Sequence, residues 1–184
     1  MEVRKQMLQL AMKARDLQQS QTPEPITTDY RFETADGAAT LSKLMGDRDE
    51  LIVIHNMGKG CSYCTLWADG FNGFRKPLED RAAFVVVSPD DPATQAEFAA
   101  SRGWSFRMAS DQDKTFTKDM GYLDDDGNWH PGVSGFARQP DGSIARTGRD
   151  YLGPYDPYCS VWHLFGLLPE QEWHPKMSYD LQPA

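Results

Sequence analysis

The sequence predicts an α/β layer sandwich in which a central mixed β-sheet is covered by helices on both faces. Strand and helix patterns alternate along the chain as far as about residue 120, and this order places helices over a sheet. Two short strands joined by a turn then follow, and after them comes a final helix. The continuous apolar run at 82–87 (AAFVVV) indicates a strand buried on both faces.

The composition is that of one globular domain of ordinary size. The chain has 184 residues, of which 40% are hydrophobic and 25% are charged, so it can bury a substantial core. A formal net charge of -8 disfavours nucleic acid and anionic membrane surfaces as partners. No apolar run approaches the roughly 18 residues of a membrane-spanning helix, and the first residues lack the apolar core of a secretion signal. We therefore expect a cytoplasmic protein.

The region 1–24 is expected to be an N-terminal helix followed by a linker. Within 1–19, apolar residues recur at a 4-3-4-3 spacing and form a narrow seam on one helical face: Val3, Met7, Leu10, Ala14 and Leu17. Two interpretations of the seam remain open. The helix can lie on the domain, or it can form the contact of a homodimer, although this length is short for a coiled coil. Pro23 and Pro25 indicate a linker at 21–28.

The main domain is placed at 25–168. Alternating polar and apolar residues predict a strand at 30–34, and Asp36-Gly37 is a turn signal. A short helix is predicted at 40–45, where the apolar residues can all face inward.

The second half of the domain alternates in the same way. Its predicted elements, in order, are a strand at 82–87, a helix ending near 102, a strand at 106–109, a helix at 111–120, a hairpin of 133–138 with 143–147, and an amphipathic helix at 158–168. Capping residues at 88–92 open the first of these helices, and Gly103 ends it. Pro140-Asp141-Gly142 supplies the turn of the hairpin. Residues 169–184 are expected to be a C-terminal tail.

The segment 51–64 carries the clearest chemical signal of the chain. The run 51–54 (LIVI) predicts a buried strand, and a polar, glycine-containing loop follows at 56–60. Cys61-Ser62-Tyr63-Cys64 then opens a helix, which Pro77 is expected to break or restart. The motif therefore lies at the carboxyl end of a central strand, where α/β folds place their active sites.

Two cysteines three positions apart at the start of a helix lie on the same face, one turn apart. Free backbone N–H groups and the helix dipole stabilise a thiolate there, and such placement lowers a cysteine pKa from about 8.5 to roughly 3.5–7.5. The chain has three cysteines, which is an odd number and no disulfide framework. We therefore predict a redox pair in which Cys61 attacks a disulfide and Cys64 resolves the mixed disulfide.

The strand–loop–CxxC–helix unit, the later apolar strand and the terminal hairpin with its helix resemble the thioredoxin superfamily. Residues 106–111 (FRMASD) and 136–144 (FARQPDGSI) resemble the peroxiredoxin branch. The segment GCSYCTLWADGFNG is similar to the signature of the family called domain of unknown function 899, whose members are described as predicted thioredoxin-like dithiol-disulfide oxidoreductases. The resemblance covers about 25–168. It implies a thioredoxin-like fold, a protein or small-molecule thiol or disulfide as substrate, and no bound cofactor.

The resemblance also implies a role for His55. This residue lies six positions before Cys61, at the place where thioredoxin has a buried acid that accepts the proton of the resolving thiol. An imidazole can accept a proton near neutral pH. The other interpretation is a structural histidine at the end of the strand.

Three alternatives to the dithiol enzyme remain open. A peroxiredoxin-like thiol peroxidase would use Cys64, but the Pro and Thr of the Pro-x-x-x-Thr-x-x-Cys pattern are then replaced by Met57 and Cys61. A zinc site would combine the CxxC pair with Cys159 and His163, which are spaced i, i+4 on a predicted helix. The third alternative is a non-catalytic binding module with the same fold, with or without zinc.

Overall fold

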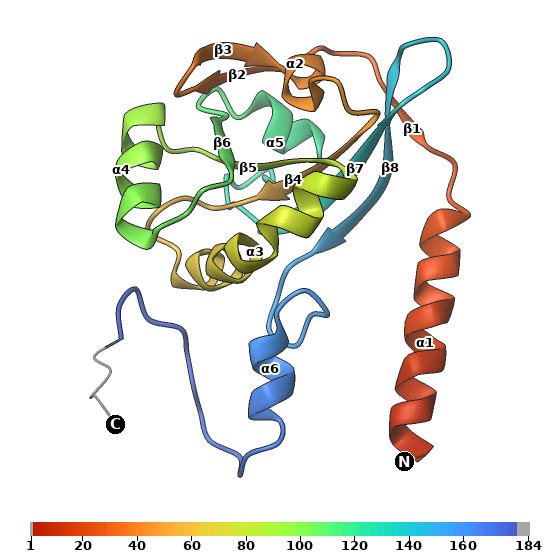
Figure 1. Ribbon diagram of the computed structural model, residues 1–184, viewed down its shortest axis with the longest axis vertical. Helices are drawn as coiled ribbons and strands as arrows, with labels where there is room; N and C mark the ends of the chain where they lie inside the picture. Colours follow the sequence, from red (N-terminus) through yellow and green to blue (C-terminus); the bar gives the residue numbers. More distant parts are fainter. Residues whose placement is uncertain (1, 180–184) are drawn as a thin grey trace.

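The computed structural model describes residues 2–179 and confirms the α/β class, with helices on both faces of one mixed sheet (Figure 1). The eight strands lie in the order β1-β8-β7-β4-β5-β6-β2-β3. They are β1 (Glu24–Ile26), β2 (Arg31–Thr34), β3 (Gly37–Thr40), β4 (Glu50–His55), β5 (Ala83–Ser88), β6 (Arg107–Ser110), β7 (Gly132–Arg138) and β8 (Ile144–Tyr151). The helices are α1 (Glu2–Gln19), α2 (Leu41–Met45), α3 (Ser62–Arg81), α4 (Pro92–Arg102), α5 (Thr115–Asp119) and α6 (Ser160–Phe165).

The central strands carry the mixed pairing of the sheet. β4 pairs in parallel with β5 and antiparallel with β7, and β5 pairs in parallel with β6. Parallel neighbours need a long crossover, and α3 provides it between β4 and β5. The CxxC motif thus lies directly after the carboxyl end of β4, in the middle of the sheet.

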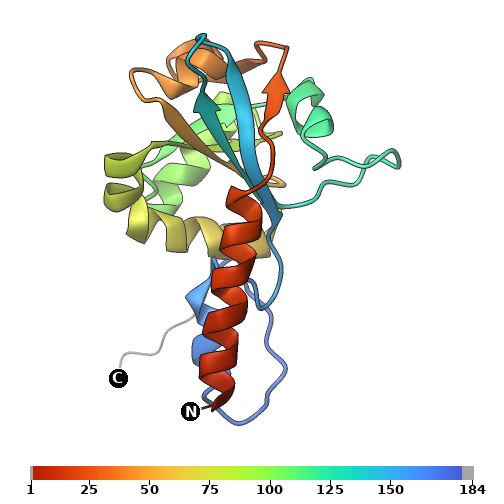
Figure 2. The ribbon, with the colours of Figure 1, turned by 90° about the vertical axis from the view of Figure 1, so that its right-hand side faces the viewer.

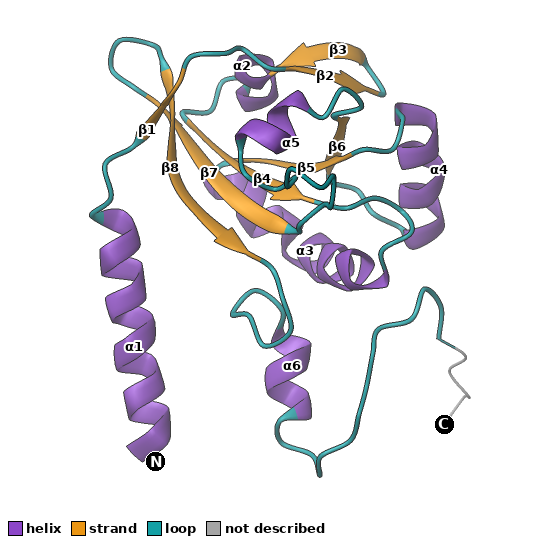
Figure 3. Ribbon diagram, turned by 180° about the vertical axis from the view of Figure 1, so that it is seen from behind, coloured by secondary structure: helices purple, strands orange, loops and turns teal. Residues whose placement is uncertain are grey.

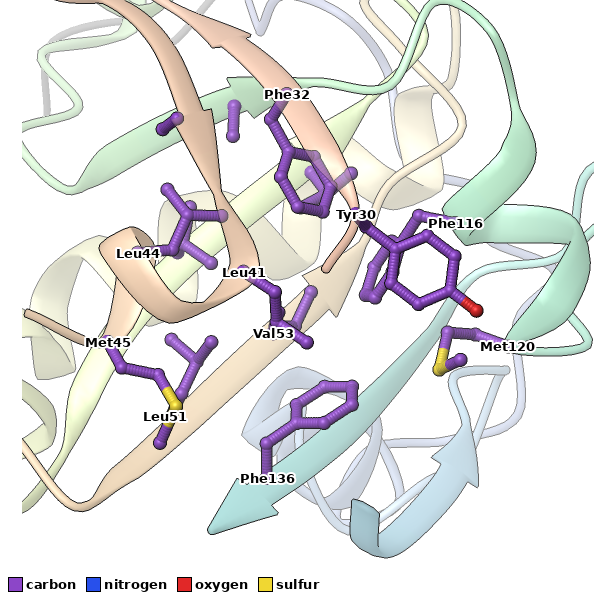
Figure 4. Packing of buried hydrophobic residues seen from close by; sticks show 14 of the residues in the cluster. Tyr30, Phe32, Leu41, Leu44, Met45, Leu51, Val53, Phe116, Met120 and Phe136 are labelled. Carbon is purple, nitrogen blue, oxygen red and sulfur yellow. The ribbon is translucent and has the colours of Figure 1, made fainter. Parts of the chain in front are cut away.

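Residues alternate along β4 between two apolar cores. Leu51 and Val53 belong to the core under α2 and α5, together with Phe116, which is fully buried (Figure 4). Ile54 belongs to the other core, which α3 covers with Trp67. In Figure 3 the sheet is seen from behind, with α5 in front of it and α3 beneath. Burial on both faces explains why β4 and β5 read as continuous apolar runs.

Local signals set the boundaries of α4. Asp91 is its N-cap and accepts a hydrogen bond from the Thr94 backbone N–H at 3.0 Å. Pro92 occupies the first turn, where no N–H is needed. Gly103 ends the helix in the left-handed conformation, with φ of 68°. This helix is therefore confirmed as predicted.

Several predicted boundaries are wrong. α3 continues through Pro77 to Arg81, so the expected break does not occur. The sequence does not predict β1 or β3. β1 lies inside the expected linker and pairs antiparallel with β8, where the Glu24 carboxylate lies 3.1 Å from Nε of the buried Arg146. α5 starts later than 111, since the buried Asp111 accepts hydrogen bonds from the N–H and hydroxyl of Thr117 instead of joining the helix.

The N-terminal helix is confirmed, but the interpretation in which it lies on the domain is wrong. α1 projects away from the sheet (Figure 2) and buries none of its residues. Gln18, in its last turn, donates to the carbonyl of Arg149 in β8 at 3.3 Å. The apolar seam, from Val3 to Leu17, is exposed. Among residues 2–179, no helix is long and apolar enough to cross a membrane.

Candidate active site

The two thiols of the CxxC motif are held at the first turn of α3. Cys61 is the N-cap of the helix, and its Sγ accepts a hydrogen bond from the Cys64 backbone N–H at 3.0 Å. Its carbonyl accepts from both the N–H and the hydroxyl of Thr65, at 3.0 and 2.9 Å. Cys61 is partly exposed and Cys64 is buried, and both are free thiols. The motif therefore offers one reachable sulfur and one protected sulfur.

The environments of the two thiols separate their pKa values. A hydrogen bond from the Cys64 side chain lowers the pKa of Cys61 to about 7, against the opposing effect of burial, and the N–H groups of Cys64 and Tyr63 add to the lowering. The pKa of Cys64 is raised because its thiol donates to Cys61, because it is buried and because the Cys61 charge lies beside it. Cys61 is thus the sulfur that ionises first.

The loop between β4 and α3 directs a backbone N–H at the buried thiol. The Met57 backbone N–H points to Cys64 Sγ, with 3.4 Å between the two atoms. Asn56 Oδ1 accepts from the Gly58 N–H at 2.8 Å, and the Asp90 carboxylate accepts from the Lys59 N–H at 2.8 Å. Gly58 has φ of 99°, and a Cβ there would approach Asp90 Oδ2 to 3.0 Å, so the position favours glycine. These bonds fix the direction of the Met57 N–H.

His55 is not brought together with the thiols. Its ring stacks on Tyr122 with 3.9 Å between centroids and on Phe116 at 5.4 Å, and Nε2 lies 2.9 Å from the Ser134 hydroxyl oxygen. Both rings belong to the core under α2 and α5, because strand alternation turns His55 away from the face that α3 covers. The ring contacts of His55 therefore lie within the core under α2 and α5.

Burial, reinforced by the charge of Arg146, lowers the pKa of His55 to about 3. The unfolded chain takes up this proton near pH 6.5 and the folded chain does not, so the stabilising contribution of neutral His55 is complete above pH 6.5 and is lost as the pH falls toward 3. We expect the unfolding free energy of the wild type to fall faster between pH 6.5 and 4 than that of His55→Phe, by up to about 1.4 kcal/mol per pH unit. Urea unfolding at several pH values measures this difference; parallel pH curves would contradict it.

The chain also matches a known family. A family model described as "Bacterial protein of unknown function (DUF899)" matches residues 1–177. The chain belongs to this family. The match runs through α1 and into the segment after α6. No curated protein matches the sequence.

Solved structures similar to this DUF899 protein share its fold. The peroxidoxin BcpB of Mycobacterium tuberculosis is 20% identical, with 71% of this chain and 86% of that chain covered and a TM-score of 0.56. A peroxiredoxin-like protein from Aquifex aeolicus is 19% identical, with 72% and 76% covered and a TM-score of 0.57. A mutant of Xylella fastidiosa PrxQ is 16% identical, with 80% and 96% covered and a TM-score of 0.56. The thioredoxin-like fold with peroxiredoxin-like features is thereby confirmed.

The four residues of the zinc alternative do not converge in the DUF899 structure. Cys159 is the N-cap of α6, is buried in the core that α3 covers, and donates its backbone N–H to Asp156 Oδ1 at 2.9 Å. Across the described residues 2–179, no cluster of three or more His, Cys, Asp or Glu side chains has the geometry of a metal site. The geometry thus gives the zinc hypothesis no support.

The segment after α6 crosses the start of α3, a contact that the sequence does not predict. The Tyr63 hydroxyl lies 2.8 Å from His174 Nδ1, and the Met177 carbonyl accepts from Arg102 Nη1 at 2.8 Å. Arg102 is in turn paired with Asp69 of α3, which also accepts from the Trp104 indole N–H at 2.7 Å. We call residues 169–179 the C-terminal strap. Its aromatic residues, unusual for a mobile tail, are the only sequence signal of its docking.

Proposed function

We propose that this protein is a thiol-disulfide oxidoreductase that cycles Cys61 and Cys64 between dithiol and disulfide. The observation that carries the proposal is the difference in exposure and pKa between the two thiols at the first turn of α3. Cys61 is partly exposed, with its pKa lowered to about 7, while Cys64 is buried, with its pKa raised. A thiol with a pKa near the ambient pH is the most effective attacking group in disulfide exchange.

The same contacts explain how the second thiol becomes active only after the first has reacted. The Cys61 thiolate attacks one sulfur of a substrate disulfide, the substrate S–S bond breaks, and the first substrate half leaves as a thiolate that takes a proton from water. Cys61 is then neutral, so the charge and the hydrogen bond that raise the pKa of Cys64 are gone. Burial still opposes ionisation, but the Met57 N–H remains 3.4 Å from Sγ to stabilise the Cys64 thiolate.

Cys64 gives its proton to water, and its thiolate then attacks the Cys61 sulfur. The bond between Cys61 and the second substrate half breaks, that half leaves as a thiolate that takes a proton from water, and the Cys61–Cys64 disulfide forms. An external dithiol must reduce this disulfide to close the cycle. The scheme assigns no step to His55, whose ring packs in the core under α2 and α5. We further propose that the protein works in the cytoplasm, where thiols stay reduced, and that the exposed seam of α1 forms a homodimer contact.

Titration of the Cys61 thiolate tests the proposal directly. We expect its alkylation by iodoacetamide to show a midpoint near pH 7 in the wild type. In Cys64→Ala the midpoint should rise toward the value of about 8.5 of a free thiol, since the donor with the largest effect is lost. Cys159→Ala is the control and should leave the midpoint unchanged. A wild-type midpoint near 8.5 would contradict the proposal and favour a non-catalytic binding module.

A thiol peroxidase that uses Cys64 is the second candidate. The Met57 N–H directed at Cys64 Sγ favours it, since such a donor stabilises the thiolate that attacks peroxide. Against it stand the burial and the raised pKa of Cys64. Peroxide-dependent oxidation of an external thiol that survives Cys61→Ser but not Cys64→Ser would establish the peroxidase in place of the dithiol cycle.

A further inference from the structure

A cavity of about 660 Å³ lies between α6 and the C-terminal strap. Tyr63, the residue directly before Cys64, forms part of its wall from the α3 side. The rest of the wall comes from α6 and from the loops before and after it, which lie beneath α3 in Figure 1. Ligand cavities in proteins typically measure about 300–1,000 Å³, so this one can hold an amino-acid side chain and its neighbours.

Aromatic rings form a large part of the wall of the cavity. Tyr63, Tyr155, Trp162, Phe165 and Trp173 all line it. Phe165 packs edge-on against Trp173 with 4.8 Å between centroids, and Trp162 does so at 5.7 Å. Tyr155 remains largely exposed, so ring surface is available to an incoming group. Such surfaces bind planar or large apolar groups through burial and ring–ring contact.

The charge of the wall also restricts which groups can bind in the cavity. Glu170 and Glu172 line the cavity, and none of the residues described along its wall is a lysine or arginine. His174 contacts both sides of the wall, since its Nε2 lies 3.2 Å from Glu172 Oε1 and its Nδ1 lies 2.8 Å from the Tyr63 hydroxyl. The whole chain is also acidic. Anionic groups are therefore repelled, whereas cations gain both from the carboxylates and from the ring faces.

We propose that this cavity is the substrate-binding site of the oxidoreductase, and that it selects disulfides whose flanking group is aromatic or large and apolar and carries no negative charge. The inference rests on the proposed function, because the cavity meets the redox motif through Tyr63. A flanking group bound there would contact Tyr63, two residues after Cys61 in the chain, and the thiolate of Cys61 would displace one half of the disulfide as described above. Disulfides with anionic flanks would be poor substrates.

Three symmetric peptide disulfides of matched reactivity test the selection: N-acetyl-Cys-Phe-Lys-amide, the same peptide with Gly for Phe, and the same peptide with Glu for Lys. With a dithiol as reductant, we expect the Phe-Lys disulfide to have the highest kcat/KM, by about tenfold over the Gly-Lys disulfide, as one buried ring allows. Trp173→Ala should remove most of the preference for Phe. The double variant Glu170→Gln with Glu172→Gln should remove the preference for Lys over Glu.

The exposed Phe74 of α3 does not line the cavity, so Phe74→Ala is the matched control and should keep all preferences. Equal kcat/KM values in the wild type, or a Phe preference that survives in Trp173→Ala, would overturn the inference. Binding of N-acetyl-Ala-Phe-Lys-amide, measured by isothermal titration calorimetry, separates the two proposals since this peptide has no sulfur. Binding that depends on Trp173 but is accompanied by no disulfide reduction would leave the cavity assignment standing and refute the oxidoreductase; absence of binding would refute the cavity assignment.

Discussion

Cys61→Ser is expected to lose disulfide reductase activity by a factor on the order of 10³ or more, because a serine hydroxyl does not ionise near neutral pH and is a weak nucleophile. The lost group is the only CxxC sulfur that is partly exposed and has a lowered pKa. The buried Cys64 cannot replace it, since a substrate disulfide does not reach a buried sulfur. Reduction of a peptide disulfide in the presence of an external dithiol, followed as kcat/KM, measures the loss.

Cys159→Ser is the matched control for this experiment. Cys159 is a free cysteine like Cys61, but it is buried, lies at the start of α6 and forms no part of the CxxC motif. Its variant should keep activity within about twofold of the wild type, provided that thermal unfolding shows an intact fold, since no transition-state contact is removed. Activity of Cys61→Ser close to that of the Cys159 control would remove Cys61 from the mechanism.

Phe116→Ala should produce the largest loss of stability, about 3–5 kcal/mol, as expected when a fully buried phenylalanine is truncated. Phe116 has 0% exposure and contacts rings from several elements. Its centroid lies 5.1 Å from that of Tyr30, 5.0 Å from Phe32 and 6.0 Å from Phe136 (Figure 4). The cavity left behind would loosen α5 from the sheet and remove one of the two rings that stack on His55.

Phe74→Ala provides the comparison, because this phenylalanine of α3 is 54% exposed. Its unfolding free energy should stay within about 0.5 kcal/mol of the wild type. Urea unfolding of both variants gives the two values under identical conditions. A cost below about 1 kcal/mol for Phe116→Ala would mean that the core under α2 and α5 is less tightly packed than the ring contacts indicate.

The elements that the sequence predicts well are those with strong local signals. The strand before the motif follows from an apolar run, and α4 follows from the Asp91 cap and the Gly103 end. The position of both cysteines on the first turn of α3 follows from their spacing. These features depend on neighbours in the chain, so they can be read without knowing the fold.

The features that the sequence does not reveal depend on contacts between distant residues. β1 pairs with the distant β8 and places Glu24 against Arg146, and the C-terminal strap places His174 against Tyr63. The orientation of His55 depends on strand alternation relative to the two cores. The family resemblance assigns His55 a role by its position, but the direction of its side chain decides what it can contact.

The most direct test of the central claim is to identify the sulfur that captures a substrate. Cys64→Ser is treated with a stoichiometric peptide disulfide without reductant, and the trapped adduct is located by peptide mapping and mass spectrometry. The variant cannot resolve the mixed disulfide, so we predict a stable adduct on Cys61, with Cys159 unmodified because it is buried and its pKa is raised. An unmodified Cys61, or an adduct on Cys159 alone, would contradict the proposal that Cys61 is the attacking thiol.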